Sequence, residues 1–311
     1  MAENITILGQ CFNLSHKKTL TKQKIEDYSS TFLADLIDPD KKDLFKLSKI
    51  NKNDNSATCK IEIYQQSIHP FSEGGFHLSA VLVCEFIDLF IRKIYEKKLL
   101  LNLLYLEMVC KNPIRKKILK PAVSINSSSN HNYSFIKPEK YGDDKIDISY
   151  DIENNSFSGN IEYISKKCDH FAKNNFKTSS DLSKHNSFNI LDFFVNGLEA
   201  NVKIIFSCET LSSNGFVLGP GLALTICSQL VIIHVYAISG SEGKNKSVVV
   251  SNFKFICKKN IKSPNTINFR SKIKKISPSN KSKKHIKIDV DCFFNDGDCK
   301  AELTYYFESF S

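Results

Sequence analysis

The feature that most constrains this sequence is an internal repeat with a nearly constant offset. Four pairs of segments occur in the same order in both parts of the chain, 142 to 147 residues apart. The pairs are CKIEIY (59–64) with VKIIFS (202–207), LSAVLVCEFI (78–87) with GLALTICSQL (221–230), MVCKNPI (108–114) with FICKKNI (255–261), and residues 145–164 with 287–306. Because loop lengths vary while core elements keep their spacing, the pairs indicate a duplicated unit of about 110 residues.

Each copy is predicted to contain one strand, a polar turn, one long helix and then several strands. In the first copy, the alternating β-branched residues of 59–64 are typical of a strand, and 76–98 has the length and basic last turn of a helix. Further strands are expected over LLYLEMVC (103–110), KILKPAVSI (117–125), DKIDISYDI (144–152) and SFSGNIEYI (156–164). The helix is apolar on nearly every face, so a curved antiparallel sheet wrapped around it is the simplest way to bury it.

Strand, central helix and strand meander is the element order of the hotdog fold. We therefore expect an α+β protein with a tandem (double) hotdog, in which two curved antiparallel sheets each wrap a long central helix. Hotdog unit 1 is expected at 56–165, a linker at 166–188 and hotdog unit 2 at 189–311. Residues 1–55 are expected to form an N-terminal helical extension, with an amphipathic helix entered from Thr21 and packed on the first unit.

Charge and cysteine content indicate the kind of partner and compartment. The excess of 43 Lys and Arg over 33 Asp and Glu gives a formal net charge of +10, which favours acidic partners, although a solvated basic surface has the same composition. The ten cysteines form no C-x-x-C spacing, which argues against a metal site or a disulfide framework and for reduced thiols. The N-terminus does not resemble a signal peptide. We expect a cytoplasmic protein without a bound metal.

One segment, residues 215–240, is long and nearly uncharged and must be tested as a membrane span. It carries Gly-Pro-Gly near its start, includes Gln229 and His234, and is followed by polar, strand-like sequence. We therefore expect a buried helix and no membrane span, with His234 as a core histidine.

Two groups of hotdog proteins resemble the first copy. Residues 32–90 follow the order of FcoT-like long-chain acyl-CoA thioesterases, namely an L-x-P segment, a polar strand, a G-x-F or G-H-F turn and a helix. HPFSEGGFH (69–77) also resembles the H-x-F-F and Gly-Gly-x-His motifs of A-factor biosynthesis hotdog proteins. LGPGLALTICSQ (218–229) is similar to the helix start of acyl-carrier-protein dehydratases. At the level of the double-hotdog thioesterase and dehydratase superfamily, the resemblance covers about residues 55–311.

The resemblance implies a protein that processes acyl thioesters, either as an acyl-CoA or acyl-carrier-protein thioesterase or as a 3-hydroxyacyl dehydratase. Two alternatives stay open: acyl transfer of the A-factor type, and non-catalytic binding of an acyl ligand or carrier. Coenzyme A or phosphopantetheine would arrive as part of the substrate, with no separate cofactor. Acyl-CoA or acyl carrier protein is the expected partner, a homodimer is among the expected assemblies, and nucleic acid is not favoured.

Some family positions carry other residues here. FcoT-like enzymes present an asparagine at the helix start and a second one inside the helix, where this chain has Ser79 and Asp88. Dehydratases pair a histidine from one unit with an Asp or Glu from the helix of the other. The second helix here has Thr225 at that place, and the glutamate is Glu85 in the first helix.

Acyl-thioester chemistry needs helix N-terminal N–H groups near the thioester carbonyl and an acid or base beside it. We expect His69, Glu85 and His77 to be catalytic, with His69 as general base. A surface histidine, a helix-cap histidine and an ion-paired glutamate are the corresponding structural alternatives. Because a buried unpaired carboxylate is costly, Glu85 should have a partner or a raised pKa. Asp88 is expected to pair with Arg92 at i+4.

Small and polar residues at the two helix entries are the expected substrate-binding residues. They are Gly74, Gly75, Ser79, Gly221, Thr225 and Gln229. The basic segments 112–120 and 271–287 are interpreted as loops that hold coenzyme A phosphates or an acidic carrier surface, or as solvated hairpins. His69, His77 and Glu85 have no counterparts in the second copy, where Ser212, Pro220 and Ser228 fall in register.

Overall fold

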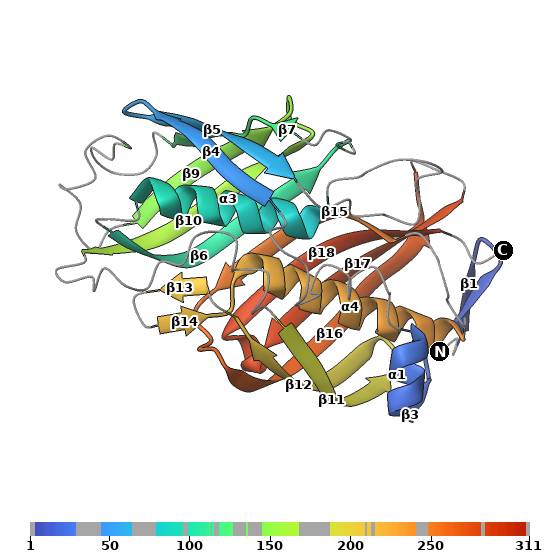
Figure 1. Cartoon of the computed structure of the whole chain (residues 1–311). Helices are drawn as coiled ribbons and strands as arrows, with labels where there is room; N and C mark the ends of the chain where they lie inside the picture. The colour runs from blue at the N-terminus through green and yellow to red at the C-terminus, as the bar shows by residue number, and fades with distance from the viewer. Residues whose placement is uncertain are drawn as a thin grey trace.

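In the computed structural model, a large antiparallel sheet accompanies two long helices (Figure 1). The structure describes residues 4–28, 45–63, 79–95, 99–112, 114, 118–126, 135, 145–167, 187–208, 210–212, 215–240, 248–280 and 284–308. Within these residues the large sheet has 14 strands and every strand pairing in it is antiparallel. A large antiparallel sheet with few helices fits the α+β hotdog fold.

The elements follow the predicted order in each half. The first half contains β4 (Phe45–Lys52), β5 (Ser56–Ile63), α3 (Ala80–Tyr95), β6 (Leu99–Cys110), β7 (Ile118–Leu119), β8 (Ala122–Ile125), β9 (Lys145–Ile152) and β10 (Phe157–Lys167). The second half contains β11 (Ser187–Asn196), β12 (Glu199–Ser207), β13 (Thr210–Ser212), β14 (Gly215–Val217), α4 (Pro220–Ser239), β15 (Val248–Cys257), β16 (Asn265–Pro278), β17 (His285–Phe294), the 3-10 turn η2 (Asn295–Gly297) and β18 (Cys299–Glu308). The strands expected at 103–110, 144–152 and 156–164 are confirmed, whereas the one expected at 117–125 is divided into the short strands β7 and β8.

The strand order in the sheet is mirrored about its centre. It runs β3-β11-β12-β16-β17-β18-β15-β6-β10-β9-β8-β5-β4. Counted outward from the junction of β15 and β6, the strands correspond in pairs: β18 to β10, β17 to β9, β16 to β8, β12 to β5 and β11 to β4. The two members of each pair hold the same place in the element order of their halves. The short β3 at one edge is outside this correspondence. The repeated sequence pairs fall on these equivalent strands and on the two helices. The halves are joined across the centre by an antiparallel pairing in which Phe255 lies opposite Leu106.

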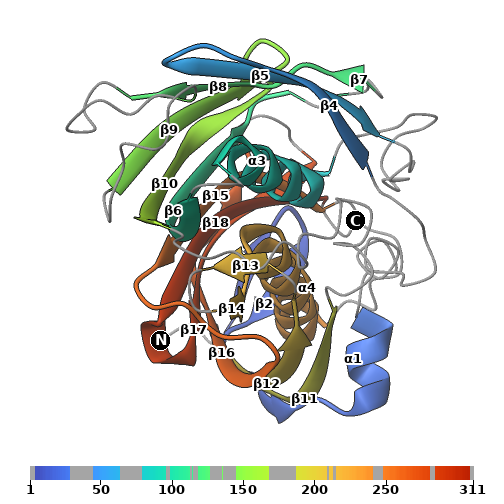
Figure 2. The same cartoon turned by 60° about the vertical axis from the view of Figure 1, so that its left-hand side comes forward.

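Sequence pattern explains these elements locally. In β5 and β12 buried and more exposed residues alternate, as expected for strands with one face on the core. Figure 2 shows strands on more than one side of each helix, and α4 is apolar around its whole circumference and buried. Pro220 occupies the start of α4, and Gly240 ends it in the left-handed region at φ 64°.

The helix α4 is long and apolar enough to cross a membrane, but 94% of its most apolar 18-residue window is buried inside the protein. The predicted buried helix is therefore confirmed. His234 lies within it as a fully buried side chain. Its ring nitrogens lie 2.9 Å from the Ser271 hydroxyl and 2.8 Å from the Gly197 carbonyl, and burial lowers its pKa to about 4. His234 is a core histidine, as predicted.

The N-terminal region differs from the prediction. It contains three strands, β1 (Asn4–Ile7), β2 (Gln10–Asn13) and β3 (Lys17–Thr19), before the helix α1 (Lys22–Tyr28). Such short strands give too little alternation to stand out in a sequence. The described helix α1 contacts α4 of the second half rather than the first half, with the rings of Tyr28 and Tyr236 6.1 Å apart; residues 29–37 of the expected helix lie outside the described residues.

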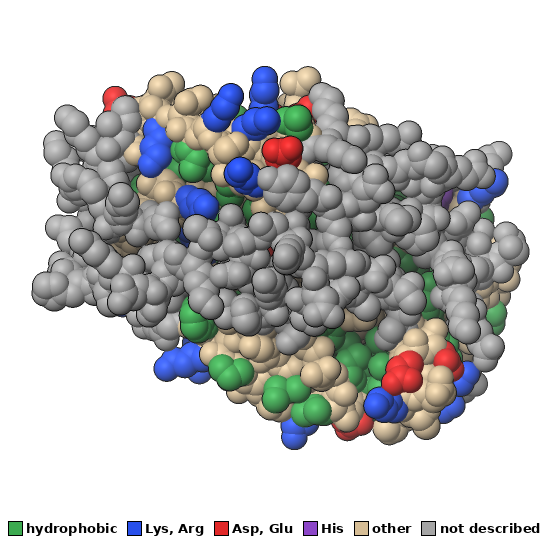
Figure 3. Space-filling view, viewed as in Figure 1, with side chains coloured by type: hydrophobic (Ala, Val, Ile, Leu, Met, Phe, Trp, Pro, Cys, Tyr) green, Lys and Arg blue, Asp and Glu red, His purple; other side chains and the backbone are tan. Residues whose placement is uncertain are grey.

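The described part of the basic segment 271–287 agrees with the hairpin alternative rather than with a phosphate-binding loop, because it belongs to the antiparallel neighbours β16 and β17. Residues up to Pro278 belong to β16, and two of its lysines pair with acids on neighbouring strands. Lys272 lies 3.1 Å from Glu199, and Lys274 lies 2.9 Å from Asp291. On the face in Figure 3, several Lys and Arg side chains lie near one another at the upper left, and others are scattered along the lower edge and at the right.

Candidate functional site

The side chain of Glu85 lies at the N-terminal end of α4. The helices α3 and α4 pack against each other, and Glu85 projects from α3 toward the first turn of its neighbour. A Cβ atom at Gly221 would overlap the Glu85 carboxyl group, so glycine is the residue that leaves room for it. The backbone N–H of Leu222 donates a hydrogen bond to the Glu85 carboxylate. Two predicted site residues, Glu85 and Gly221, are thus brought together from different halves of the chain.

This position raises the pKa of Glu85 to about 7. The Glu85 residue is partly exposed at the protein surface. Burial of its carboxyl group is nevertheless the main cause, because removing a carboxylate from water disfavours its charged form. The negative charge of Asp88 acts in the same direction, whereas Arg92 and the Leu222 N–H favour the ionised form. At neutral pH both the protonated and the ionised form of Glu85 are therefore present.

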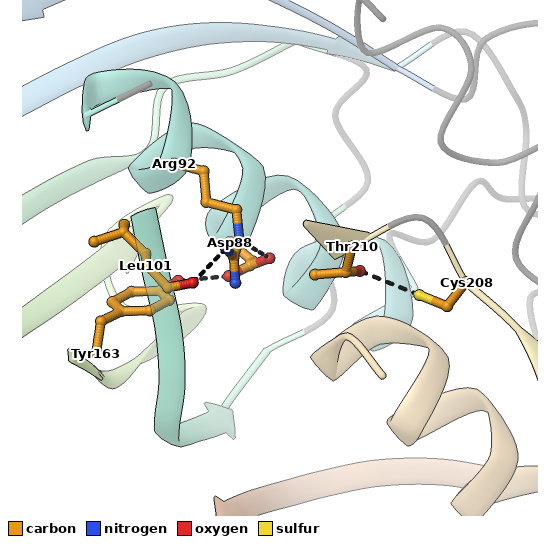
Figure 4. Close-up of polar contacts among 6 residues, drawn as sticks. All are labelled: Asp88, Arg92, Leu101, Tyr163, Cys208 and Thr210. Carbon is orange, nitrogen blue, oxygen red and sulfur yellow. Dashed lines mark hydrogen bonds and ion pairs between the residues drawn. The ribbon is translucent and has the colours of Figure 1, made fainter. Parts of the chain in front are cut away.

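Asp88, one turn further along α3, is held by two partners (Figure 4). Arg92 Nε donates to one Asp88 oxygen at 2.8 Å, and Tyr163 Oη donates to the other at 2.6 Å. Arg92 Nη1 also donates to the Leu101 carbonyl at 2.7 Å, and its guanidinium carbon lies 5.5 Å from the centre of the Tyr163 ring. The predicted Asp88–Arg92 pair is confirmed, and the network fixes a negative charge close to Glu85.

A second polar pair, Cys208 and Thr210, lies at the same end of α4 (Figure 4). Cys208 Sγ is 3.2 Å from Thr210 Oγ1, and the backbone N–H groups of Thr210 and Gly219 donate hydrogen bonds to the sulfur. Burial and then the charge of Glu85 raise the pKa of Cys208 to about 11. A Cβ atom at Gly219 would overlap the Thr210 hydroxyl. Because Gly219 and Gly221 have no side chains, there is room for Thr210 and Glu85 beside the start of α4.

The other predicted residues have varied positions. Ser79 caps α3, since its Oγ accepts a hydrogen bond from the Val81 N–H at 3.2 Å. Thr225 is buried and donates to the Gly221 carbonyl at 3.0 Å, and Gln229 lies one turn later in α4 with a partly exposed side chain. A role of these side chains in substrate binding stays a prediction. Outside the described residues lie His69, His77, Gly74 and Gly75.

The second half carries a different side chain at the place of Glu85. Ser228 is buried in α4, and its hydroxyl accepts a hydrogen bond from Tyr305 at 3.2 Å. Tyr305 in β18 corresponds to Tyr163 in β10, which instead donates to the charged Asp88. The two halves thus share a buried tyrosine against the helix but differ in charge. Among the residues that the structure describes, no group of three His, Cys, Asp or Glu side chains is placed to hold a metal ion.

Comparison with known proteins gives structural likeness at low sequence identity. No protein-family model matches the chain, and no curated protein matches it. The chain is similar to the tesB protein of Mycobacterium avium subsp. paratuberculosis, with a TM-score of 0.47 and 8% identity over 90% of this chain and 99% of that one. It is also similar to the acyl-CoA thioesterase II TesB2 of Mycobacterium marinum, with a TM-score of 0.47 and 6% identity over the same shares.

A third similar structure is the dehydratase domain of RzxB from Pseudomonas fluorescens, with a TM-score of 0.43 and 11% identity over 85% of this chain and 98% of that one. The second and third of these structures are described as an acyl-CoA thioesterase and a dehydratase domain. At these TM-scores and identities, the likenesses assign no activity to this chain.

Sequence reasoning missed three contributors to the site: Tyr163, Cys208 and Thr210. Tyr163 was part of an expected strand, and Cys208 was grouped with small core cysteines. A signal for Tyr163 exists in the repeat, because Tyr163 and Tyr305 are in register at the offset of 142 residues. No comparable signal marks Cys208 or Thr210, which reach the site because the chain turns there from β12 into β13.

Proposed function

We propose that this chain is a tandem hotdog enzyme that processes acyl thioesters, with Glu85 as its general acid or base. The observation that carries the proposal is the position of the Glu85 carboxyl against the first turn of α4, where its pKa is about 7. A group with a pKa near the working pH is present in both protonation states and exchanges a proton at small free-energy cost. The acyl-thioester class itself comes from the sequence resemblance.

The N-terminus of α4 supplies the second requirement of this chemistry. Backbone N–H groups at a helix start favour negative charge, and a thioester carbonyl gains negative charge when it is attacked or when its α-proton is removed. In the proposed mechanism the first turn of α4 faces the thioester oxygen, while Glu85 removes a proton from water or from the substrate. Hydrolysis and dehydration share this arrangement and differ in which proton is moved.

The mirrored strand order supports the tandem hotdog. Each half has the element order strand, helix and further strands, and the two halves join edge to edge at β6 and β15. In this proposal unit 1 runs from β4 to β10 and unit 2 from β11 to β18, so the strands extend the units beyond the expected bounds of 56–165 and 189–311: β4 begins at Phe45, β10 ends at Lys167 and β11 begins at Ser187. Each long helix serves as the central helix of its unit, and the candidate site lies where α3 meets the start of α4.

We further propose acyl-CoA or acyl carrier protein as the partner, with coenzyme A or phosphopantetheine entering as part of the substrate. The reaction would take place in the cytoplasm, which fits the free thiols of the described cysteines.

The test uses purified full-length chain and panels of acyl-CoA and acyl-carrier-protein substrates of different chain lengths. Hydrolysis is followed by thiol release and dehydration by mass spectrometry. Glu85→Gln keeps the size of the side chain but cannot exchange the proton, and it should lower turnover by about 10²–10⁴-fold. Ser228→Ala, at the equivalent place in the second half, is the matched control and should leave turnover within about threefold. Absence of turnover on every substrate, or an unaffected Glu85→Gln variant, would exclude the proposal.

A further inference from the structure

The sulfur atoms of Cys257 and Cys299 lie 3.1 Å apart inside the second half of the sheet. Cys257 is the last residue of β15, Cys299 is the first residue of β18, and the two are direct partners in the antiparallel register. The Cα atoms of such partners are about 4.5 or 5.5 Å apart, and disulfides form across Cα separations of about 4.4–6.8 Å. The two strands therefore hold these thiols at a spacing that a disulfide can bridge.

We propose that Cys257 and Cys299 form an oxidisable dithiol, a modification site whose oxidant is a peroxide. The Cys257 sulfur attacks one oxygen of hydrogen peroxide and the O–O bond breaks; the thiol proton passes to the departing oxygen, so that a sulfenic acid and one molecule of water result. The Cys299 thiol then attacks the sulfenic sulfur, which forms the S–S bond and releases a second molecule of water. In total the two thiols lose two electrons and two protons, and the peroxide is reduced to water.

Hydrogen bonding assigns different roles to the two thiols. The Cys299 thiol donates to the Cys257 sulfur, and this bond together with burial raises the pKa of Cys299 well above its usual range. The raised pKa disfavours the thiolate form of Cys299, and Cys257 is the more exposed of the two side chains, at 5% against 1%. This arrangement suits Cys257 as the attacking group and Cys299 as the thiol that resolves the sulfenic acid.

The location of the pair explains why the oxidant must be small. The side chains of Cys257 and Cys299 are only 5% and 1% exposed. They lie at the ends of their strands, however, next to the exposed Lys258 and Lys259, and each thiol lies 3.5 Å from the Lys259 carbonyl oxygen. A peroxide is small enough to reach the sulfurs from this end, whereas a folded protein disulfide is not.

The first half lacks an equivalent pair. Cys110 at the end of β6 matches Cys257 in the repeat, but its register partner in β10 is Phe157. The shared fold therefore does not require two cysteines at this place. The pair is a property of the second half alone.

A cross-link here would act on the segment that supports the start of α4. Downstream of Cys257, the Ile261 carbonyl accepts from the Leu218 N–H at 2.9 Å, and the Ser263 N–H donates to the Phe216 carbonyl at 2.9 Å. The Ser263 hydroxyl accepts from the Cys208 N–H at 2.6 Å. Fixing the beginning of this segment to β18 would restrain the segment, so oxidation should slow hydrogen exchange of its amides.

The experiment treats the reduced full-length chain with hydrogen peroxide, blocks remaining thiols under denaturing conditions, and maps peptides by mass spectrometry. The expected product is a Cys257–Cys299 linked peptide with the loss of two hydrogens, together with slower amide exchange over 258–263. In Cys299→Ser the link should be lost and a sulfenic acid at Cys257 should be trapped by a carbon nucleophile. Cys227→Ser is the matched control. It removes another buried thiol, one that contacts Cys292, and it should keep the Cys257–Cys299 link.

Two results would overturn the proposal. In the first, peroxide treatment of the wild type gives no linked peptide, or it links Cys257 or Cys299 mainly to other cysteines. In the second, the Cys257–Cys299 link forms but amide hydrogen exchange over 258–263 stays unchanged. That result would show that the link does not act on the segment that supports the start of α4. The peptide map of the wild type decides the first point even where the Cys299→Ser variant does not fold.

Discussion

Glu85 of α3 accepts a hydrogen bond from the backbone N–H of Leu222 in the first turn of α4. These residues belong to different halves of the chain, so the contact exists only because the two long helices pack against each other. The helix start favours the carboxylate, while burial and Asp88 favour the protonated form. Together these effects place the pKa of the Glu85 carboxyl group at about 7.

The close fit of Glu85 against Gly221 predicts a coupled pair of substitutions. Gly221→Ala adds a methyl group that overlaps the Glu85 side chain, and it should lower the free energy of unfolding by about 1–3 kcal/mol. In a Glu85→Ala background the overlap is gone, and alanine should cost nothing or stabilise, because it is a better helix former than glycine. Denaturant unfolding of the four proteins measures the coupling. Equal costs in both backgrounds would show that the two side chains do not meet.

The two buried tyrosines predict unequal effects of the same substitution. Tyr163→Phe removes a hydrogen bond to the charged Asp88 and should cost about 1.5–3 kcal/mol of stability. Tyr305→Phe removes a bond to the neutral Ser228 hydroxyl and should cost only about 0.5–1.5 kcal/mol. Thermal or denaturant unfolding compares them directly, and each variant is the control for the other. A larger loss in Tyr305→Phe would contradict the Asp88 network.

Glu85 also predicts how stability depends on pH. Its pKa is about 7 in the folded chain against an ordinary value of 4.5, so between these pH values the folded state keeps a proton that the unfolded state has lost. Its contribution to stability therefore falls as the pH rises through this window, by at most about 3–4 kcal/mol. Relative to wild type, Glu85→Gln should become steadily more stable from pH 4.5 to 7.

His234 acts in the opposite direction and must be separated from Glu85. Its pKa is about 4 in the folded chain against 6.5 ordinarily, so the stability it contributes is lost as the pH falls through this range. Both proteins contain His234, so its effect cancels when the unfolding free energies of wild type and Glu85→Gln are subtracted. A difference that stays flat with pH would mean that Glu85 titrates normally.

Much of the fold could be predicted because the sequence repeats itself. The matched segments fall on equivalent strands and on the two helices, and the apolar circumference of 220–239 required a buried helix. Local spacing was enough for the Asp88–Arg92 pair, since residues four apart lie on one face of a helix. The position of α1 was not accessible in this way, because its contact with Tyr236 depends on how distant elements pack.

The candidate site was predictable only in part. The repeat singled out Glu85 as a residue without a counterpart, and helix-start chemistry singled out Gly221, but nothing local indicates that they touch. Tyr163 and Asp88 are 75 residues apart in sequence, and their bond depends on how β10 lies against α3. Contacts of this kind are set by tertiary packing, on which periodicity carries no information.

The most direct test of Glu85 as the acid or base is the pH dependence of kcat/KM on the best thioester substrate. We predict a single titration near pH 7, rising with pH if Glu85 acts as a base and falling if it acts as an acid. Glu85→Gln should lose this titration along with about 10²–10⁴-fold in kcat/KM. A profile that is level through pH 7, or one that is unchanged in Glu85→Gln, would contradict the account.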